Sequence, residues 1–362
     1  MWITSSPTSA RKPTKIALGN FDGVHLGHQR VIEPVLTHKG GLPSLVLAED
    51  ICSQPVAGHT FGYSDLPGND SLSDLVSDSA IAKSPTSDFD EWASVVTFFP
   101  HPKEFFSGQS RPLLTPLEEK SRQLACLGVD QLVLLPFNAT LARLDATAFV
   151  EQVLIRDLQA THISVGSDFH FGKGRGGNAE LLGAIAAQHN IPVTIVPLHN
   201  DSEGRISSSR IRQALTEGEL TKANRLLGRP YTLTGQVITG KQLGRTIGFP
   251  TANLKLPDNK FIPRQGVYSV NVFGVLPDQI PISGVMNIGK RPTVAGQDLS
   301  VEVHLLSWEG NLYGKTLTVS LESFIRPEQK FASLDALKEQ IAQDCNTARI
   351  ALQQITSEAT QP

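Results

Sequence analysis

Two histidines stand near the start of the chain among several glycines. The stretch GNFDGVHLGHQ covers residues 19–29 and directly follows the apolar run at 16–18. His25 and His28 could hold a metal ion, belong to an ordinary hydrogen-bonded turn, or donate hydrogen bonds to a phosphate under attack. A metal site lacks a third ligand at short spacing, and a plain turn accounts less well for the glycines. The pattern favours a strand, a glycine turn and a helix whose N–H groups face a nucleotide phosphate.

A second set of oxygen-bearing side chains lies in the C-terminal half. PTAN at 250–253 offers Thr251 and Asn253. Their oxygens suit a hard cation, although these four residues alone are also typical of a turn. In VEVHLL at 301–306, strand alternation puts Glu302 and His304 on the same face. Residue type alone leaves a solvent-facing, salt-bridged glutamate as the alternative for Glu302.

Three glycine-rich stretches resemble nucleotide-binding motifs only superficially. GKGRGG at 172–177 satisfies G-x-G-x-x-G but does not open a standard βαβ unit, so an anion-binding loop fits it better. The segments at 235–242 and 284–291 match G-x-x-x-x-G-K but continue with Gln or Arg. A P-loop needs Ser or Thr there to bind magnesium, so neither segment is predicted to be one.

The elements that would position the histidines alternate between strands and helices. Apolar runs at 16–19, 93–99, 130–137, 161–166 and 191–198 predict strands. Helical patterns lie at 27–38, 149–158 and 179–189, and another runs to residue 127. The latter begins with Thr115 and Glu118 at capping-box spacing and Pro116 at the first helical position. A parallel sheet with helices on its faces is the predicted α/β fold.

The alternation of predicted strands and helices is interrupted at two places along the chain. Residues 50–91 are rich in Ser, Asp, Gly and Pro, which predicts a mobile surface insertion. Beyond the boundary predicted at 228–229, short β-rich runs separated by Gly and Pro predict a small antiparallel barrel. Helical spacing from Ser333, a good N-cap, to residue 355 predicts a C-terminal helix on that barrel.

Composition narrows the function classes. The chain has 362 residues and a formal net charge of −3 without a long basic run, which argues against a general nucleic-acid or membrane-binding surface. Cys52, Cys126 and Cys345 are widely separated and odd in number, as expected in a reducing, cytoplasmic setting. The polar start lacks the apolar region of a secretory signal and predicts a disordered tail, and no stretch is long enough to span a bilayer. No obligate protein partner is implied.

Several separated motifs point to one family. GNFDGVHLGH resembles the H-x-G-H signature of nucleotidylyltransferases, in the form carried by the prokaryotic bifunctional riboflavin kinase and FMN adenylyltransferase family. TFFPHP at 97–102, VGSDFHFGKGRGG at 165–177 and ISSSRIR at 206–212 are similar to further motifs of that family. GKQLGRTIGFPTAN at 240–253 and VEVHLL are similar to its kinase motifs. The matches are collinear from about residue 14 to residue 344.

The resemblance implies a Rossmann-like nucleotidylyltransferase domain at 14–228 that joins AMP to FMN, giving FAD and pyrophosphate. The nucleophile is a phosphate oxygen that is already anionic, so alignment and charge neutralisation matter more than a base. His25 and His28 would be the catalytic pair, and Asp168 would lie in the nucleotide or flavin pocket. The remaining residues placed at the ATP phosphates are Asn20, Phe21, Asp22, Gly23, Gly27, Ser207, Ser208 and Arg212.

For residues 229–356 the resemblance implies a riboflavin kinase domain that makes FMN from riboflavin and ATP. A primary alcohol is a weak nucleophile, so this site needs a carboxylate base and magnesium. Glu302 would be the base, and Thr251 and Asn253 would bind Mg²⁺. The residues placed at the phosphates are Gly240, Gly244, Arg245, Gly248 and Pro250. Candidates for the flavin or nucleotide pocket are Gly266, Tyr268 and Arg326, with core packing as the alternative for Tyr268.

Two positions depart from the family pattern. Phe99 stands where the family commonly has a polar residue, and Ser209 replaces a threonine but keeps the hydroxyl. Two other functions therefore stay open at this point. One is a monofunctional riboflavin kinase with an impaired adenylyltransferase domain, and the other is a non-catalytic flavin-sensing protein.

Overall fold

The computed structural model describes residues 1–36, 91–240, 243–277, 280–293 and 296–359. By their contacts, the described residues divide into two compact units, one up to Ser207 and the other from Ser208 onward. The segment 50–91 predicted as an insertion lies, except for Glu91, outside the described residues. The boundary at 228–229 stays a prediction about the functional domains.

The first unit is built on a parallel sheet, and its described strands follow the order β1-β4-β3-β2-β5-β8. Their bounds are β1 (Trp2–Thr4), β2 (Thr14–Leu18), β3 (Trp92–Phe99), β4 (Gln131–Pro136), β5 (Ala160–Gly166) and β8 (Val193–Val196). Ile16, Ala17 and Leu18 are all completely or almost completely buried. Continuous apolar runs are typical of strands covered on both faces.

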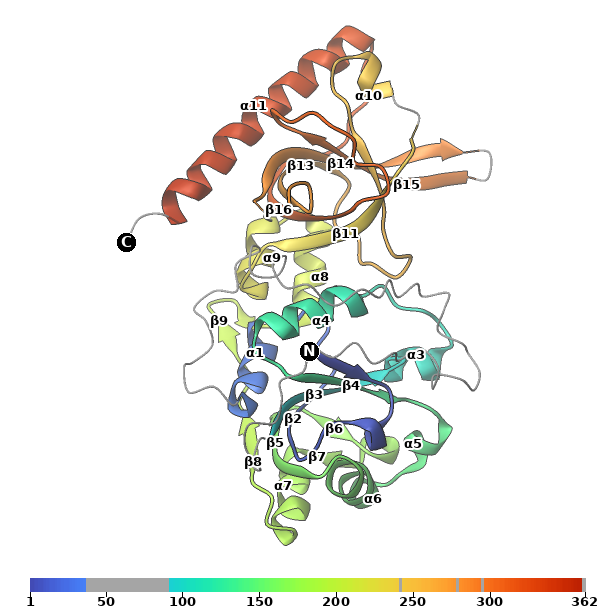
Figure 1. The fold of residues 1–362 in the computed structure, drawn as a ribbon, viewed down its shortest axis with the longest axis vertical. Coiled ribbons are helices and arrows are strands. Elements are labelled where there is room, and N and C mark those ends of the chain that lie inside the picture. The colour runs from blue at the N-terminus through green and yellow to red at the C-terminus, as the bar shows by residue number, and fades with distance from the viewer. Residues whose placement is uncertain (37–90, 241–242, 278–279, 294–295, 360–362) are drawn as a thin grey trace. The chain divides into compact units, whose positions relative to one another are not determined.

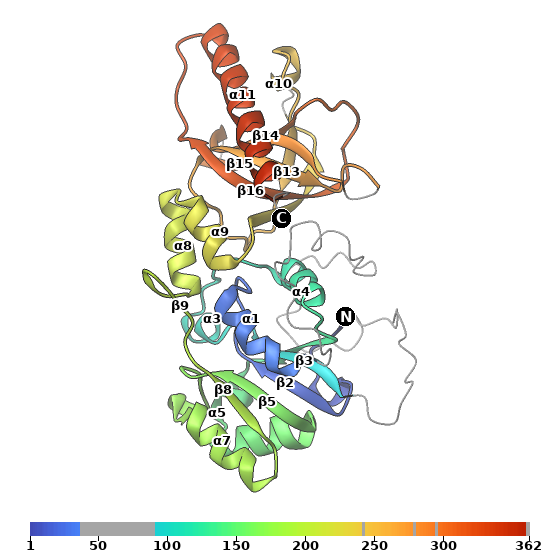
Figure 2. The ribbon, with the colours of Figure 1, turned by 90° about the vertical axis from the view of Figure 1, so that its left-hand side faces the viewer.

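Helices cover both faces of this sheet (Figures 1 and 2). On one face lie α1 (Leu26–Ile32), followed by the 3₁₀ turn η2 (Glu33–Val35), and α4 (Leu117–Cys126). On the other face lies α7 (Ala179–Gln188), and the π-helical segment η4 (Phe149–Asp157) shares its apolar cluster. The shorter elements are η1 (Pro7–Ser9), α3 (Pro102–Ser107), α5 (Ala139–Arg143), α6 (Ala146–Ala148), β6 (His170–Phe171), η5 (Lys173–Arg175), β7 (Gly177–Asn178), β9 (Asn200–Asp201) and β10 (Gly204–Arg205).

The strand order defines where a ligand site belongs. The chain leaves β2 toward β3 and β4, then returns past β2 to β5 on its other side. In open parallel sheets, ligands bind at the carboxyl ends of the strands where the order reverses in this way. GNFDGVHLGH begins directly after β2 and therefore lies at this position.

The second unit contains a closed antiparallel barrel in the order β11-β12-β15-β14-β13-β16, with β16 pairing back to β11. The strands are β11 (Tyr231–Ile238), β12 (Ala252–Lys255), β13 (Gly266–Phe273), β14 (Ile282–Thr293), β15 (Gly296–Leu305) and β16 (Thr316–Arg326). The helices are α8 (Ser208–Glu217), α9 (Leu220–Leu227), α10 (Leu243–Thr246) and α11 (Leu334–Ala359). Cys345 and Ala348 of α11 pack on Val267 and Val285 of the barrel.

The predicted fold class is confirmed for both units. Ser333 caps α11 as predicted, since its Oγ accepts the Ala336 N–H at 3.1 Å. Within the described ranges, none of the helices has the length and apolar composition that crossing a membrane requires.

Two local predictions are wrong, and one strand was not predicted. The start of the chain is not a disordered tail, because β1 pairs with β4 and Arg11 stacks on the ring of Trp2. Thr115 does not cap α4, whose N-cap is Pro116 without a side-chain cap bond. Thr115 Oγ1 instead accepts the Gly23 N–H at 2.9 Å. The sequence prediction also missed β12, a short strand that begins inside PTAN.

Candidate active sites

The turn after β2 has an unusual backbone. Phe21 has φ 49°, Gly23 has φ 93° and Val24 has φ 42°. Glycine adopts such angles easily, but each non-glycine residue there costs about 1–3 kcal/mol, and a β-branched residue is a genuine outlier. The surrounding structure must therefore hold this turn in place.

The two histidines lie against each other at the start of α1. His25 is the N-cap, and its Nδ1 accepts the His28 N–H at 3.2 Å. The two rings stack with their centroids 3.6 Å apart. A neutral His25 with an accepting Nδ1 carries its proton on Nε2, which leaves that nitrogen as a donor. A Cβ at Gly27 would lie 3.1 Å from Cε1 of His25, so glycine makes room for the ring.

Asp22 faces away from solvent and ties the turn to the residues before α4. It is 6% exposed, and its Oδ1 accepts the Thr115 N–H at 3.2 Å. Within the described part of the chain, no group of three His, Cys, Asp or Glu side chains is arranged to hold a metal ion. The Nδ1 atom of His25 is engaged by the His28 N–H, so hydrogen-bond donation from Nε2 is the role that the geometry of the pair supports.

The other predicted phosphate residues are divided between the units. Asp168 follows β5 and forms an ion pair with Arg205. Ser207 belongs to the first unit, and the carbonyl of its neighbour Ile206 would lie 3.8 Å from a Cβ at Gly27. Ser208 and Arg212 belong to the second unit, where the Arg212 guanidinium lies over the ring of Phe261.

An aromatic cluster that sequence reasoning missed follows β3 and β4. Phe106 of α3 is 72% exposed, and its ring packs edge-on against Phe105 and Phe137. Phe99 ends β3, and its carbonyl accepts the Phe137 N–H at 2.9 Å. An aromatic ring left open to solvent at a ligand-binding end of a sheet offers a stacking surface.

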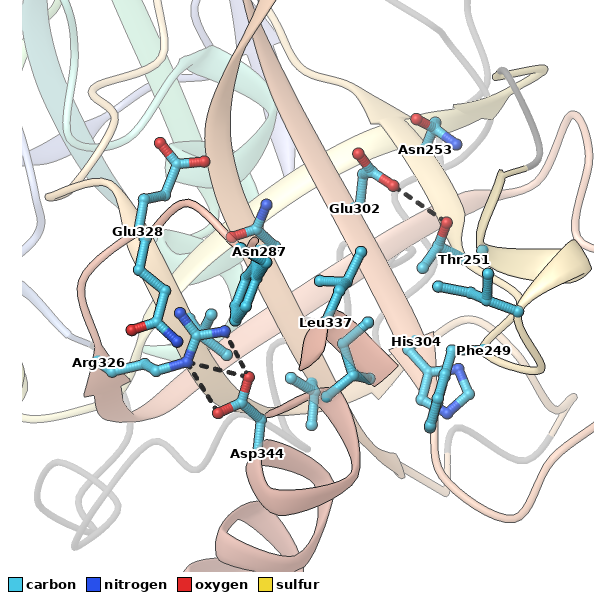
Figure 3. A pocket seen from close by; sticks show the side chains of 17 residues that line it. Phe249, Thr251, Asn253, Asn287, Glu302, His304, Arg326, Glu328, Leu337 and Asp344 are labelled. Carbon is cyan, nitrogen blue, oxygen red and sulfur yellow. Dashed lines mark hydrogen bonds and ion pairs between the residues drawn. The ribbon is translucent and has the colours of Figure 1, made fainter. Parts of the chain in front are cut away.

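In the barrel, Glu302 and the PTAN residues lie together (Figure 3). Thr251 Oγ1 donates to Glu302 Oε2 at 3.1 Å, and Ser300 Oγ donates to Glu302 Oε1 at 3.1 Å. Asn253 stands directly opposite Glu302 in the β12–β15 ladder. A Cβ at Gly240 would overlap the buried side chain of Asn253. The β-ladder and the preceding loop therefore fix these oxygen donors.

Glu302 lines a cavity of about 450 Å³, to which strands of the barrel and α11 both contribute side chains (Figure 3). Arg326 lines it and is held by Asp344 of α11, with Nη2 to Oδ2 at 2.7 Å and Nε to Oδ1 at 2.9 Å. The apolar lining comes from Ile247, Phe249, Val267, Val285, Phe331, Leu337 and Ile341. The cavity combines apolar and charged lining residues, which suits an aromatic ligand with polar substituents.

A second cavity of about 710 Å³ shares Thr251 with the first. Pro250, Trp308, Asn311 and Tyr313 contribute to its lining. Thr251, whose hydroxyl is bonded to Glu302, therefore lines both cavities.

The remaining predicted kinase residues have different surroundings. Gly244 lines the first cavity, and a Cβ there would overlap the Phe249 carbonyl. Gly248 has φ 88° in the loop after α10, the helix that carries Arg245. Gly266 and Tyr268 line neither cavity. Tyr268 is 1% exposed, donates its hydroxyl to the Arg264 carbonyl, and has a pKa raised by burial. Its surroundings are those of a core residue.

Comparison with known proteins adds independent information. The family model described as riboflavin kinase matches residues 227–352, and the one described as FAD synthetase matches 8–49 and 81–210. A protein named bifunctional riboflavin kinase/FMN adenylyltransferase from Escherichia coli strain K12 is 37% identical over 337 residues, covering 92% of this chain and 91% of the relative. Its namesake from Haemophilus influenzae is 36% identical over 335 residues, covering 92% of both chains.

One solved structure aligns with nearly the whole chain. It is titled a macrolide-efflux protein from Streptococcus pneumoniae and is 28% identical, with a TM-score of 0.72. The alignment covers 96% of this chain and 98% of that one. Both units thus have counterparts in a single solved chain.

Proposed function

The chain belongs to the bifunctional riboflavin kinase/FMN adenylyltransferase family, and from this premise we propose how its residues divide the two reactions. The protein phosphorylates riboflavin to FMN with ATP, and adenylylates FMN to FAD with release of pyrophosphate. We assign the first reaction to the barrel at 229–356 and the second to residues 14–228.

The observation that carries the kinase assignment is the hydrogen bond between Glu302 and Thr251, the residue that lines both cavities. Riboflavin occupies the cavity walled by Phe249 and Phe331, and ATP occupies the one lined by Trp308 and Tyr313. Glu302 accepts the proton of the riboflavin hydroxyl as its oxygen attacks the γ-phosphorus, and ADP leaves. Such a positioned base contributes about 10²–10⁴-fold.

A magnesium ion fits the same corner of the barrel. Thr251 and Asn253 supply neutral oxygen donors, and Asn253 is 8% exposed with its place fixed by Gly240. Hard cations of this kind prefer oxygen ligands and retain several waters. When bound, Mg²⁺ would neutralise charge on the ATP phosphates. Gly244, Arg245, Gly248 and Pro250 would border those phosphates.

At the adenylyl site the nucleophile is a phosphate oxygen of FMN, which needs no base. It attacks the α-phosphorus of ATP, and pyrophosphate leaves. His25 is buried and is the N-cap of α1. This position supports a role for its Nε2, together with the His28 ring, as hydrogen-bond donors to the charge that develops on the phosphate under attack. By the family motifs, Asn20, Asp22, Gly23 and Gly27 shape the turn around the phosphates. The same motifs make Asp168, Ser207, Ser208 and Arg212 further candidates for nucleotide contacts.

We also propose that the isoalloxazine ring of FMN stacks on the exposed Phe106 in this reaction. Phe105 and Phe137 pack edge-on against that ring, which keeps one aromatic face available.

The three separated cysteines support the expectation of a cytoplasmic enzyme whose ligands are riboflavin, FMN and ATP. Binding of nucleic acid or a membrane is not expected of its weakly acidic composition.

The test is a time course with riboflavin, ATP and magnesium, in which riboflavin, FMN and FAD are separated chromatographically. FMN should appear first and FAD should follow. Accumulation of FMN without FAD would instead indicate a monofunctional kinase. Bound flavin without any product would indicate a sensor.

A further inference from the structure

A buried lysine lies beneath the strained turn that carries the histidines. Lys120 of α4 is 9% exposed, and its Nζ donates to the Asn20 carbonyl at 3.1 Å. Thr97 of β3 donates its hydroxyl to the same carbonyl at 3.1 Å. We propose that Lys120, together with Thr115, is a positioning residue for adenylyl transfer. This inference rests on the proposed function.

The two residues hold opposite ends of the turn. Lys120 binds Asn20 at its start, whereas Thr115 binds Gly23 through Oγ1 and Asp22 through its N–H. Phe21, which has a positive φ, lies between these points, and Val24 follows Gly23 and leads directly to His25. Lys120 lies in the first turns of α4 and Thr115 lies two residues before its first residue, so the place of this helix sets the place of the histidines.

The charges around Lys120 support a specific role for its ammonium group. Burial lowers the pKa of Lys120, and the carboxylates of Asp22 and Glu104 oppose that shift. Glu104 is itself fixed, since it accepts the N–H of His101 at 3.0 Å and that of Arg111 at 2.7 Å. Burial of a charge is unfavourable without compensating interactions, and Lys120 has a hydrogen bond to the Asn20 carbonyl and the electrostatic attraction of two carboxylates.

Positioning of this kind affects rate more than stability. A displacement of about 1 Å at reacting groups can cost about 10²-fold in rate. Loss of the ammonium group releases the Asn20 carbonyl from one of its two donors, and the histidines then lose their alignment with the ATP phosphates. The kinase reaction of the barrel does not depend on this turn.

The experiment compares Lys120→Met, Lys120→Arg and Thr115→Val in the full-length chain, with Arg122→Met as a matched control. Arg122 lies on the same helix and pairs with Glu118 rather than with the turn. FMN adenylylation is measured with FMN supplied, and riboflavin phosphorylation is measured on the same preparation. Thermal unfolding reports the folded state of each variant.

We expect Lys120→Met to lower kcat/KM for adenylylation about 10- to 100-fold, with a raised KM for ATP. Lys120→Arg should restore part of the loss, Thr115→Val should reproduce it more weakly, and Arg122→Met should leave both reactions within twofold of wild type. Riboflavin phosphorylation should change in none of them.

Two results would overturn the inference alone, provided that the wild type makes FAD. One is an unchanged kcat/KM in both Lys120→Met and Thr115→Val. The other is a lower rate with an unchanged KM for ATP and no rescue by arginine, which indicates loss of folded protein only. If the wild-type chain itself makes no FAD, the proposed function and this inference both fail.

Discussion

The two candidate sites are built in opposite ways. The histidines lie on an irregular turn whose backbone includes Phe21 and Val24 in the left-handed region. Glu302 and Asn253 lie on paired strands of a closed barrel, where the ladder fixes their places. A turn depends on distant neighbours to hold it, whereas a ladder holds its own side chains. Changes far from the reacting atoms should therefore affect adenylyl transfer more than phosphorylation.

The chemistry explains why each construction suffices. An alcohol needs a base within hydrogen-bond distance, and a rigid strand is well suited to hold a single carboxylate. A phosphate nucleophile needs several donors that converge on one charge, and a turn at a helix start supplies both N–H groups and side chains. Glu302 already has two hydroxyl donors, from Thr251 and Ser300, that fix its orientation.

Glu302→Gln should have the largest effect. Glutamine keeps the shape and can still accept from Thr251, but it cannot take a proton from riboflavin. We expect FMN formation to fall about 10³-fold, within the range for a lost general base, while FMN-to-FAD conversion stays within twofold. Both rates are measured on one preparation by chromatography. Equal loss of the two activities in a folded variant would contradict separate sites.

His28→Ala should rank next. The donor to His25 Nδ1 is the backbone N–H of residue 28, so this bond survives the substitution. Only the ring is lost, so we expect FAD formation to fall about 10²-fold and riboflavin phosphorylation to be unaffected. Initial rates with saturating FMN and ATP measure this. An unchanged rate would remove His28 from the catalytic assignment.

Gly240→Ala tests how tightly the barrel site is fixed. The added methyl group would overlap the buried amide of Asn253, which must then move. We expect riboflavin phosphorylation to fall about tenfold, with a higher magnesium requirement, because Asn253 leaves its place opposite Glu302. Gly183→Ala, where a Cβ would meet nothing within 4 Å, is the matched control. Equal kinase rates in the two variants would show that Asn253 need not be fixed.

Long periodic elements could be predicted from the sequence. Strands β2 to β5 contain the apolar runs that predict them, and Gly and Pro between β-rich runs indicate the barrel strands β11 and β13 to β16. Sequence motifs indicate the turn that carries the histidines and the strand that carries Glu302. Strands β1 and β12 are too short for a periodic pattern, and PTAN has the composition of a turn.

The residues that support the sites could not be predicted in this way. Thr115 has local capping-box spacing, but its partner Gly23 lies 92 positions away. Lys120 occupies a helix position where lysine is usually solvated, yet it is buried. Likewise, the helical pattern around Asp344 does not indicate that this residue bonds to Arg326. Such contacts depend on how separate elements pack, which local spacing does not encode.

The smallest expected effect is a loss of stability of the first unit at acid pH, caused by the titration of His101. Burial, followed by the charge of Arg111, lowers the pKa of His101 to about 4, and Asp22 opposes the shift. An unfolded histidine takes its proton near pH 6.5, so between pH 6.5 and 4 the unfolded chain binds more protons than the folded one. Stability of the first unit should therefore fall as the pH drops through this range. Protonation of Nδ1 would also remove the acceptor of the Lys103 N–H.

His101→Asn should remove this component, because asparagine can still accept the Lys103 N–H as an N-cap but does not titrate. In a Trp308→Phe background, tryptophan fluorescence reports only Trp2 and Trp92 of the first unit. At each pH, the urea midpoint of the His101→Asn variant is subtracted from that of the protein that retains His101. This difference should be larger at pH 7 than at pH 5. In a second background, with Trp2→Phe and Trp92→Phe, Trp308 is the sole tryptophan. The difference in urea midpoint that it reports should not depend on pH. A pH-dependent difference at Trp308 would mean that the barrel responds to the charge of His101, and the contrast between the two units would not hold.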